Sequence, residues 1–240
     1  MDKPLARWII GPVKPKGFDC LKEAIDSFSN LYPQFDLLVC HNQLTDQQRG
    51  NLEKFGVPLY EQSYTNGFCE PKGVAWKLYP VRLRLSAHEL IMDNDLVIVK
   101  KVTQIDSFLN EDKVLMYEAG ARSYGFFDRY VPKMYKINSG IYGMPPNFDM
   151  EGRIKGLFNQ SGLKEWTNSC NQGRVTWDEQ GIVAAALINY NKYIIIYLKD
   201  ITNCELDLIK GNGYHFVGIN RYTKHKPWKE WQESKLKVFL

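Results

Sequence analysis

The sequence predicts an α/β fold in which helices flank a mostly parallel central sheet. Short apolar runs alternate with segments of helical periodicity through the first half of the chain, which is typical of βαβ units. A length of 240 residues and a hydrophobic content of 44% allow one substantial core and exclude a disordered or collagen-like chain. No internal repeat, low-complexity stretch or linker interrupts the sequence, so we expect a single domain over residues 1–240.

The first half of the chain contains three short strands separated by helices. Residues 7–10 form an apolar run that stops at Gly11-Pro12, and residues 18–31 carry apolar side chains with a period close to 3.6, which predicts a strand and then a helix. The same patterns predict a strand at 35–40, a helix at 45–55 with Thr45 as its N-cap, and a strand at 58–60.

The next elements lead into an acidic motif. Residues 72–85 predict a helix that Pro80 breaks or kinks. Residues 89–92 predict a buried strand that runs directly into Asp93-Asn94-Asp95, followed by the apolar residues 96–99. Further strands are predicted at 114–117, 137–144 and 193–198, and a helix at 178–190.

The charge distribution favours a local anionic partner over a nucleic-acid duplex. The net charge is +4, and residues 210–240 contribute +5 from seven basic and two acidic side chains. A basic patch confined to the C-terminal tail fits a phosphate group or the inner face of a membrane, as a peripheral contact. Because no apolar run reaches the ~18–20 residues of a membrane span, no secretory signal precedes residue 15, and five scattered cysteines form no CxxC pair, we expect a cytoplasmic protein with reduced thiols.

Asp93 and Asp95 lie where a parallel sheet binds its ligands, beyond the carboxyl end of a strand. In extended backbone, residues i and i+2 point the same way, so both carboxylates can face one site. A divalent cation such as Mn²⁺ or Mg²⁺ would relieve their repulsion. The alternative is a plain turn, since Asp and Asn both favour turns.

Four blocks of sequence stand out, at residues 73–99, 137–141, 177–180 and 214–228, and together they resemble GT-A glycosyltransferases, particularly family 8, which contains glycogenin and the lipopolysaccharide galactosyltransferases. Residues 73–99 are similar to the family's stretch of Lys-containing helix, apolar strand and Asp-x-Asp motif. Ile137-Asn138-Ser139-Gly140-Ile141 and Trp177-Asp178-Glu179-Gln180 resemble its Asn-[Ser/Ala]-Gly strand and its Asp-Gln site, although Glu179 interrupts the latter pair. The segment from Tyr214 to Trp228 resembles its His-x-x-Gly-x-x-Lys-Pro-Trp signature, with a longer spacing here.

The resemblance implies a role for individual residues. It implies a GT-A fold with Asp93, Asp95 and His215 as ligands of Mn²⁺, or of Mg²⁺, and a catalytic region at Asp178, Glu179 and Gln180, of which Asp178 is equally suited to be a helix N-cap. It implies that the nucleotide-sugar donor is bound by residues that come from several parts of the chain, namely Ile10, Gly11, Pro12, Lys77, Asp93, Asn94, Asn138, Ser139, Gly218 and Lys226.

The implied activity is a step of carbohydrate biosynthesis, the transfer of a hexose from a UDP-sugar to a saccharide or lipid-linked acceptor. Residues 1–100 would bind the nucleotide, and residues 101–240 would shape the sugar and acceptor sites. Retention and inversion at the anomeric carbon both stay open.

Three other functions compete with this interpretation. A haloacid dehalogenase-like phosphatase also uses an Asp-x-Asp loop, but it needs that loop on the first strand and an Asp-Asp pair, which the chain lacks. A sugar nucleotidyltransferase would need a Gly-rich, Arg-containing loop after the first strand, where residues 11–17 are basic and Pro-containing instead. The third alternative is a carbohydrate-binding protein without catalytic activity.

Overall fold

A seven-stranded sheet forms the centre of the computed structural model, which describes residues 2–63, 73–159, 175–204, 207, 210–217, 219 and 224–236. Its strands are β1 (Leu5–Ile10), β2 (Asp36–His41), β3 (Leu59–Glu61), β4 (Glu89–Asp93), β6 (Val114–Glu118), β7 (Ile137–Met144) and β8 (Tyr193–Ile196). Their order is β3-β2-β1-β4-β7-β6-β8, and only β7 runs antiparallel to its neighbours. The predicted α/β class with a mostly parallel sheet is therefore confirmed.

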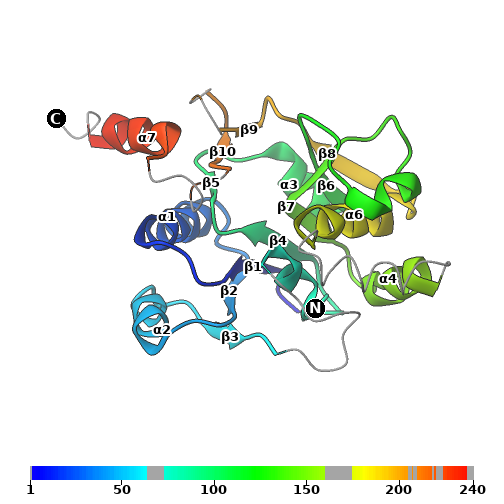
Figure 1. Cartoon of the computed structure of the whole chain (residues 1–240), viewed down its shortest axis with the longest axis horizontal. Coiled ribbons are helices and arrows are strands. Elements are labelled where there is room, and N and C mark those ends of the chain that lie inside the picture. The colour runs from blue at the N-terminus through cyan, green and yellow to red at the C-terminus, as the bar shows by residue number, and fades with distance from the viewer. Residues whose placement is uncertain are drawn as a thin grey trace.

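Helices cover both faces of this sheet (Figure 1). On one face lie α1 (Pro15–Leu31), α3 (Thr103–Leu109) and α7 (Lys226–Leu236), and on the other lie α4 (Met150–Asn159), α6 (Val175–Ile188) and the 3₁₀ helices η1 (Gly73–Leu78) and η2 (Gly125–Tyr130). A hydrophobic core lies on each face of the sheet, and successive side chains of a strand point into the two cores alternately. Trp8 and Ile10 pack on the α1 side, while Ile9 faces the α6 side. Among the described helices, none is both long and apolar enough to cross a bilayer.

A second, three-stranded sheet extends the molecule beyond the end of β4. It consists of β5 (Leu96–Ile98), β9 (Ile201–Asn203) and β10 (Gly213–His215), in the order β5-β10-β9. β10 is antiparallel to β5, with His215 opposite Leu96, and parallel to β9. Because β5 begins directly after Asp95, this sheet brings β10, from the C-terminal part of the chain, next to the acidic motif.

Most predicted elements are present within a few residues of their expected bounds, including α2 (Asp46–Glu53) with Thr45 in a capping box with Gln48. The predicted helix at 72–85 is wrong. The chain forms the 3₁₀ helix η1 and then turns at a cis Tyr79-Pro80 bond, because proline lacks the N–H of a helix interior and disfavours helical backbone in the residue before it. Asp178 is not an N-cap, since α6 begins at Val175.

A buried ion pair fixes the turn behind η1. Arg7 Nε lies 2.7 Å from Glu89 Oε1, and both side chains are fully buried. Arg7 also donates to the carbonyls of Pro80 and Val81, each at 3.0 Å, while Glu89 accepts from the backbone of Leu83. Burial lowers the pKa of Arg7, but the charge of Glu89 helps to raise it above its usual value, so the guanidinium stays charged. The pair therefore ties β1 and β4 to the segment that carries η1.

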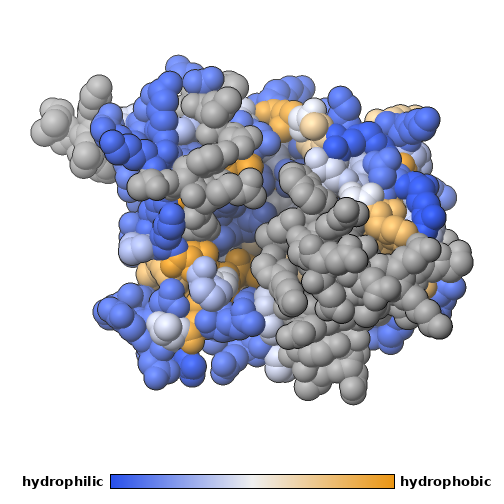
Figure 2. Space-filling model, in the orientation of Figure 1, coloured by the Kyte–Doolittle hydropathy of each residue, from blue (hydrophilic) through white to orange (hydrophobic). Residues whose placement is uncertain are grey.

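Polar side chains cover most of the described surface that faces the viewer in Figure 2. An apolar group interrupts them between α1 and α2, where Val13, Phe18 and Phe55 line a groove of about 450 Å³. Cys20, Cys40 and Cys204 are buried thiols, and the other two cysteines lie outside the described residues.

Candidate functional site

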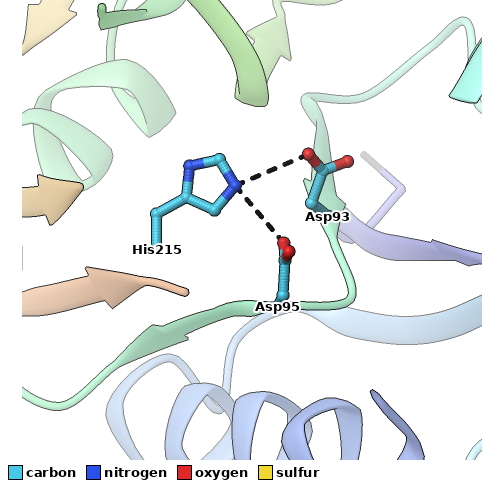
Figure 3. A group of neighbouring side chains, drawn as sticks. All are labelled: Asp93, Asp95 and His215. Carbon is cyan, nitrogen blue, oxygen red and sulfur yellow. Dashed lines mark ion pairs between the residues drawn. The ribbon is translucent and has the colours of Figure 1, made fainter. Parts of the chain in front are cut away.

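Three potential metal ligands converge at the carboxyl end of β4 (Figure 3). Asp93 ends β4, Asp95 precedes β5, and His215 ends β10. The pairing of β10 with β5, extended by a hydrogen bond from Phe216 N to Asp95 O at 2.8 Å, brings His215 beside the two aspartates. His215 Nε2 lies 3.3 Å from Asp95 Oδ1 and 3.7 Å from Asp93 Oδ2, and the candidate ligand atoms all lie within 4.8 Å of one another.

The chemistry of these atoms fits a divalent cation. Asp95 Oδ1 is buried and accepts no hydrogen bond from the part of the chain that the structure describes, even though His215 Nε2 is close to it. Such an atom is costly to bury unless a ligand completes its coordination. A ligand set of two carboxylates and one imidazole favours Mn²⁺ over Mg²⁺, because Mg²⁺ prefers oxygen ligands.

Lys77 holds the opposite side of Asp93. Its Nζ lies 2.6 Å from Asp93 Oδ1, 3.6 Å from Glu179 Oε1 and 3.2 Å from the carbonyl oxygen of Ser139. Burial lowers the pKa of Lys77, but the charges of Asp93 and Glu179 outweigh this effect and raise the pKa above its usual value. Lys77 is therefore a fixed cation that engages one oxygen of Asp93 and leaves the other toward His215.

Glu179 and Gln180 enter the same network from α6. Ser139 Oγ donates to Glu179 Oε2 at 3.1 Å, and burial raises the pKa of Glu179 to about 7, more than the nearby Lys77 lowers it. Gln180 accepts from Ser139 N at 3.4 Å and donates to Ser123 O at 3.0 Å. The backbone of Asp178 lies in α6, but its side chain is outside the description.

A cavity of about 260 Å³ opens beside this network. Lys77 and the Asp93-Asn94-Asp95 motif line one part of it, and the rest is lined by residues from the ends of β1 and β2, namely Ile9, Gly11, Pro12, Val13, Asn42 and Gln43. Ile10 contributes no side chain to the cavity, since it is buried in the core on the α1 side. The sequence interpretation missed Asn42 and Gln43, although their position directly after a parallel strand was the available signal.

Three other residues were predicted to bind the donor, and the structure describes two of them. Asn138 turns its side chain back on its own strand, accepting from Gly140 N at 2.6 Å. Lys226 is two-thirds exposed and lies 3.5 Å from Asp207 and 3.7 Å from Glu230, so in this structure it is held by carboxylates on the surface. Gly218 lies outside the described residues.

Comparison with solved structures identifies the fold. A scan against protein-family models and a search of curated proteins both find no match. The galactosyltransferase LgtC, solved with donor and acceptor sugar analogues, superposes with a TM-score of 0.57 over 98% of this chain and 95% of its own, at 12% identity. This chain has the GT-A fold. The glycosyltransferase GlyE of Streptococcus pneumoniae TIGR4 superposes with a TM-score of 0.56 over 98% of this chain and 60% of its own, at 9% identity.

The GT-A fold alone does not select the reaction. A Bacillus anthracis structure described as a glucose-1-phosphate thymidylyltransferase also superposes, with a TM-score of 0.50 over 81% of this chain and 86% of its own, at 12% identity. The GT-A resemblance predicted from the sequence is confirmed for the fold. The phosphatase alternative fails its own requirement, because Asp93 follows the fourth strand of the chain and not the first.

Proposed function

We propose that the protein is a metal-dependent glycosyltransferase that transfers a hexose from a UDP-sugar to a saccharide or lipid-linked acceptor. The observation that carries the proposal is the convergence of Asp93, Asp95 and His215 at the rim of a cavity that the ends of three parallel strands enclose. Such a crevice is where α/β sheets bind nucleotides. A nucleoside diphosphate would lie there with its base over Gly11 and Pro12 and its phosphates at the metal ligands.

The metal would supply Lewis-acid stabilisation of the charge that develops on the leaving diphosphate. This chain's residues would hold and orient the reacting groups. Asp93, Asp95 and His215 would bind the cation, and Lys77 would hold Asp93 in a fixed orientation. Glu179 would act as a positioning residue, since it reaches Lys77 and Ser139 from its buried place in α6.

The hydrogen-bond polarity at Asn42 supports a base that carries a ring N–H donor, as uracil does. Gln62 Nε2 donates to the carbonyls of Trp76 and Tyr79, so Gln62 Oε1 is the acceptor for Asn42 Nδ2, at 3.0 Å. Asn42 Nδ2 donates also to Ile10 O at 3.4 Å, which uses both of its hydrogens. Asn42 Oδ1 lies on the Gly11 side, 3.2 Å from where a Cβ of that residue would be.

A cavity that presents a carbonyl acceptor favours a base with a ring N–H. Uracil and thymine carry such a donor at N3 and guanine carries one at N1, whereas the corresponding nitrogens of cytosine and adenine are acceptors. A buried acceptor that meets another acceptor loses its hydrogen bond. Where the base presents its ring nitrogen to Asn42, this polarity therefore supports UDP, and equally TDP or GDP, over CDP and ADP.

Membrane contact through the C-terminal tail has less support than the sequence suggested. Trp228 and Trp231 are buried, with ring centroids 5.1 Å apart and both rings packed against Phe216. They are therefore occupied in the core and do not form an aromatic anchor. A lipid-linked acceptor stays a prediction from the sequence alone.

Thermal unfolding with and without Mn²⁺ tests the proposal. UDP at about a hundred times its Kd should add about 2.7 kcal/mol of stability when Mn²⁺ is present, whereas CDP should add much less. The double variant D93A/D95A should lose the metal-dependent part of this stabilisation. The control variant E53A/E151A removes two exposed carboxylates, one from α2 and one from α4, and should behave as the parent.

Two results would contradict the proposal. Equal UDP binding by D93A/D95A in chelator and by the parent in Mn²⁺ would remove the metal site from the function. Release of pyrophosphate from a nucleoside triphosphate and a sugar phosphate, without glycosyl transfer from any of a panel of nucleotide sugars, would instead indicate a nucleotidyltransferase.

A further inference from the structure

The segment that joins β6 to β7 is a basic part of the chain that leads into the candidate site. Residues 119–136 contain four basic side chains, at positions 122, 129, 133 and 136, and one acidic side chain, Asp128. The resulting charge of +3 is set beside the start of β7, which provides Asn138 and Ser139. A charge of one sign beside a binding cleft raises the local concentration of ligands of the opposite sign.

The single acidic residue of this segment is already neutralised. Arg122 Nη2 lies 2.9 Å from Asp128 Oδ1, and Arg122 also donates to the carbonyls of Val131, Pro132 and Tyr135 at 2.8–3.0 Å. One guanidinium therefore satisfies several backbone groups of the loop and fixes its shape. Arg122 serves the loop itself and is not available to a ligand.

The other three cations are presented to solvent. Arg129, Lys133 and Lys136 are exposed, and none of them forms an ion pair with any residue that the structure describes. The guanidinium of Arg129 lies 4.3 Å from the ring centroid of Phe126 and 5.1 Å from that of Tyr130. Stacking on these rings holds the Arg129 side chain in place and leaves its positive charge available to a ligand.

The segment is connected directly to the candidate site. Gln180 bridges Ser123 O of the segment and Ser139 N of β7. At the other end of the segment, Ala119 N donates to Lys136 O at 2.8 Å, which continues the ladder in which Tyr117 is opposite Asn138. Because side chains two apart on an extended strand share a face, Lys136 lies on the same face as Asn138, about 7 Å along the strand.

We propose that Arg129, Lys133 and Lys136 bind the acceptor, and that this acceptor is a saccharide that carries carboxylate or phosphate groups. The proposal rests on the proposed function for the reaction, but the binding of an anionic saccharide does not depend on it. Arg129 offers a planar fork to a carboxylate or phosphate, and the two lysines add point charges. The half-buried ring of Tyr130 adds a partly apolar surface beside them, against which a sugar ring can pack.

Calorimetric titration with defined tetrasaccharides tests the proposal. The probes are tetragalacturonate, a tetraglucoside carrying one phosphate, and neutral maltotetraose, each at low salt with UDP and Mn²⁺ present. The test variant is R129Q/K133Q/K136Q. The control variant K3Q/K113Q/K192Q removes the same charge just before β1, β6 and β8, at the opposite edge of the sheet.

We expect at least one anionic tetrasaccharide to bind the parent and the control variant within about twofold of each other and the test variant about tenfold more weakly, as the loss of three exposed charge contacts implies. Maltotetraose should bind more weakly than that probe. The two anionic probes show which charged group is preferred. Equal weakening in both triple variants, or neutral and anionic probes binding alike, would overturn the proposal.

Two further measurements separate the alternatives. If no tetrasaccharide binds, but vesicles containing phosphatidylglycerol bind the parent and not the test variant, the surface serves a membrane and the proposal is wrong. UDP stabilisation is measured on the same samples. Anionic saccharide binding that persists without any effect of UDP and Mn²⁺ would support this surface while refuting the proposed function.

Discussion

Replacing Gly140 by alanine should damage the metal site without unfolding the protein. A Cβ at Gly140 would lie 2.5 Å from His215 Cε1, 2.8 Å from Asn138 Oδ1 and 3.0 Å from His215 Nδ1. Real side chains do not make contacts below 3.0 Å, so a neighbour must move. The imidazole of His215 makes the closest contact with this Cβ, and it is the group that we assign as a metal ligand.

The size of the effect follows from these distances. To reach the ordinary contact distance of 3.4 Å, His215 Cε1 must withdraw by about 0.9 Å. Metal–ligand distances tolerate changes of only about 0.2 Å. Mutation of a residue that only supports a metal ligand lowers metal affinity by about 10–100-fold. We therefore expect the Kd of the G140A variant for Mn²⁺ to rise by a factor in that range.

The assay is titration of Mn²⁺ by electron paramagnetic resonance, together with urea unfolding. G143A is the matched control, because its Cβ would lie 2.7 Å from Phe108 Cζ, on the same strand but away from His215. Both variants should lose about 1–3 kcal/mol of stability through overpacking, and only G140A should lose metal affinity. Unchanged Mn²⁺ binding by G140A, or an equal loss in both variants, would refute the assignment of His215.

Three further predictions concern the buried polar groups. R7M should lower the free energy of unfolding by about 3–5 kcal/mol in urea titrations, because it leaves the Glu89 carboxylate buried without its cation, and R7M/E89Q should recover part of the loss. N42A should reduce the preference for UDP over CDP about fivefold in calorimetry, and N51A on the exposed face of α2 should not change it. Because burial raises the pKa of Glu179 from 4.5 to about 7, the native state keeps a proton that the unfolded state releases, so stability of the metal-free protein should fall as the pH rises from 4.5 to about 7. E179Q should flatten that fall, and an unchanged pH profile would place the titration elsewhere.

The sheet could be predicted from the sequence because its strands are short apolar runs bounded by turn residues. Residues 89–92 show this well, since four buried residues end abruptly at an acidic motif. α3, α4 and α7 were not predicted, and neither were β9 and β10. In α7 the charged residues at 226, 229, 230, 233 and 235 conceal the apolar pair Trp228 and Trp231, which packs only once Phe216 is in place. β10 has only three residues, so its strand pairing with β5 and β9 forms only in the folded chain.

The metal ligands could be predicted for two different reasons. Asp93 and Asp95 follow from local rules, because the end of a strand and a spacing of two place both carboxylates on one side. His215 lies more than a hundred positions later in the sequence, and only the resemblance to a known family pointed to it. The contacts of Lys77 with Glu179 and Ser139 could not be predicted in either way, because they join a 3₁₀ helix, a strand and a helix that approach one another only in the folded chain.

The basic C-terminal region has a structural use that its charge alone did not reveal. Lys235 lies 2.5 Å from Glu23 of α1, and Lys229 lies 3.6 Å from Glu233 within α7. Together with the packing of Trp228 and Trp231 on Phe216, these contacts hold α7 against the residue that directly follows His215. A segment of three residues such as β10 has little stability of its own, so its position depends on what packs behind it. α7 therefore supports the geometry of the candidate metal site from behind, while Lys229 and Lys235 are each paired with a carboxylate.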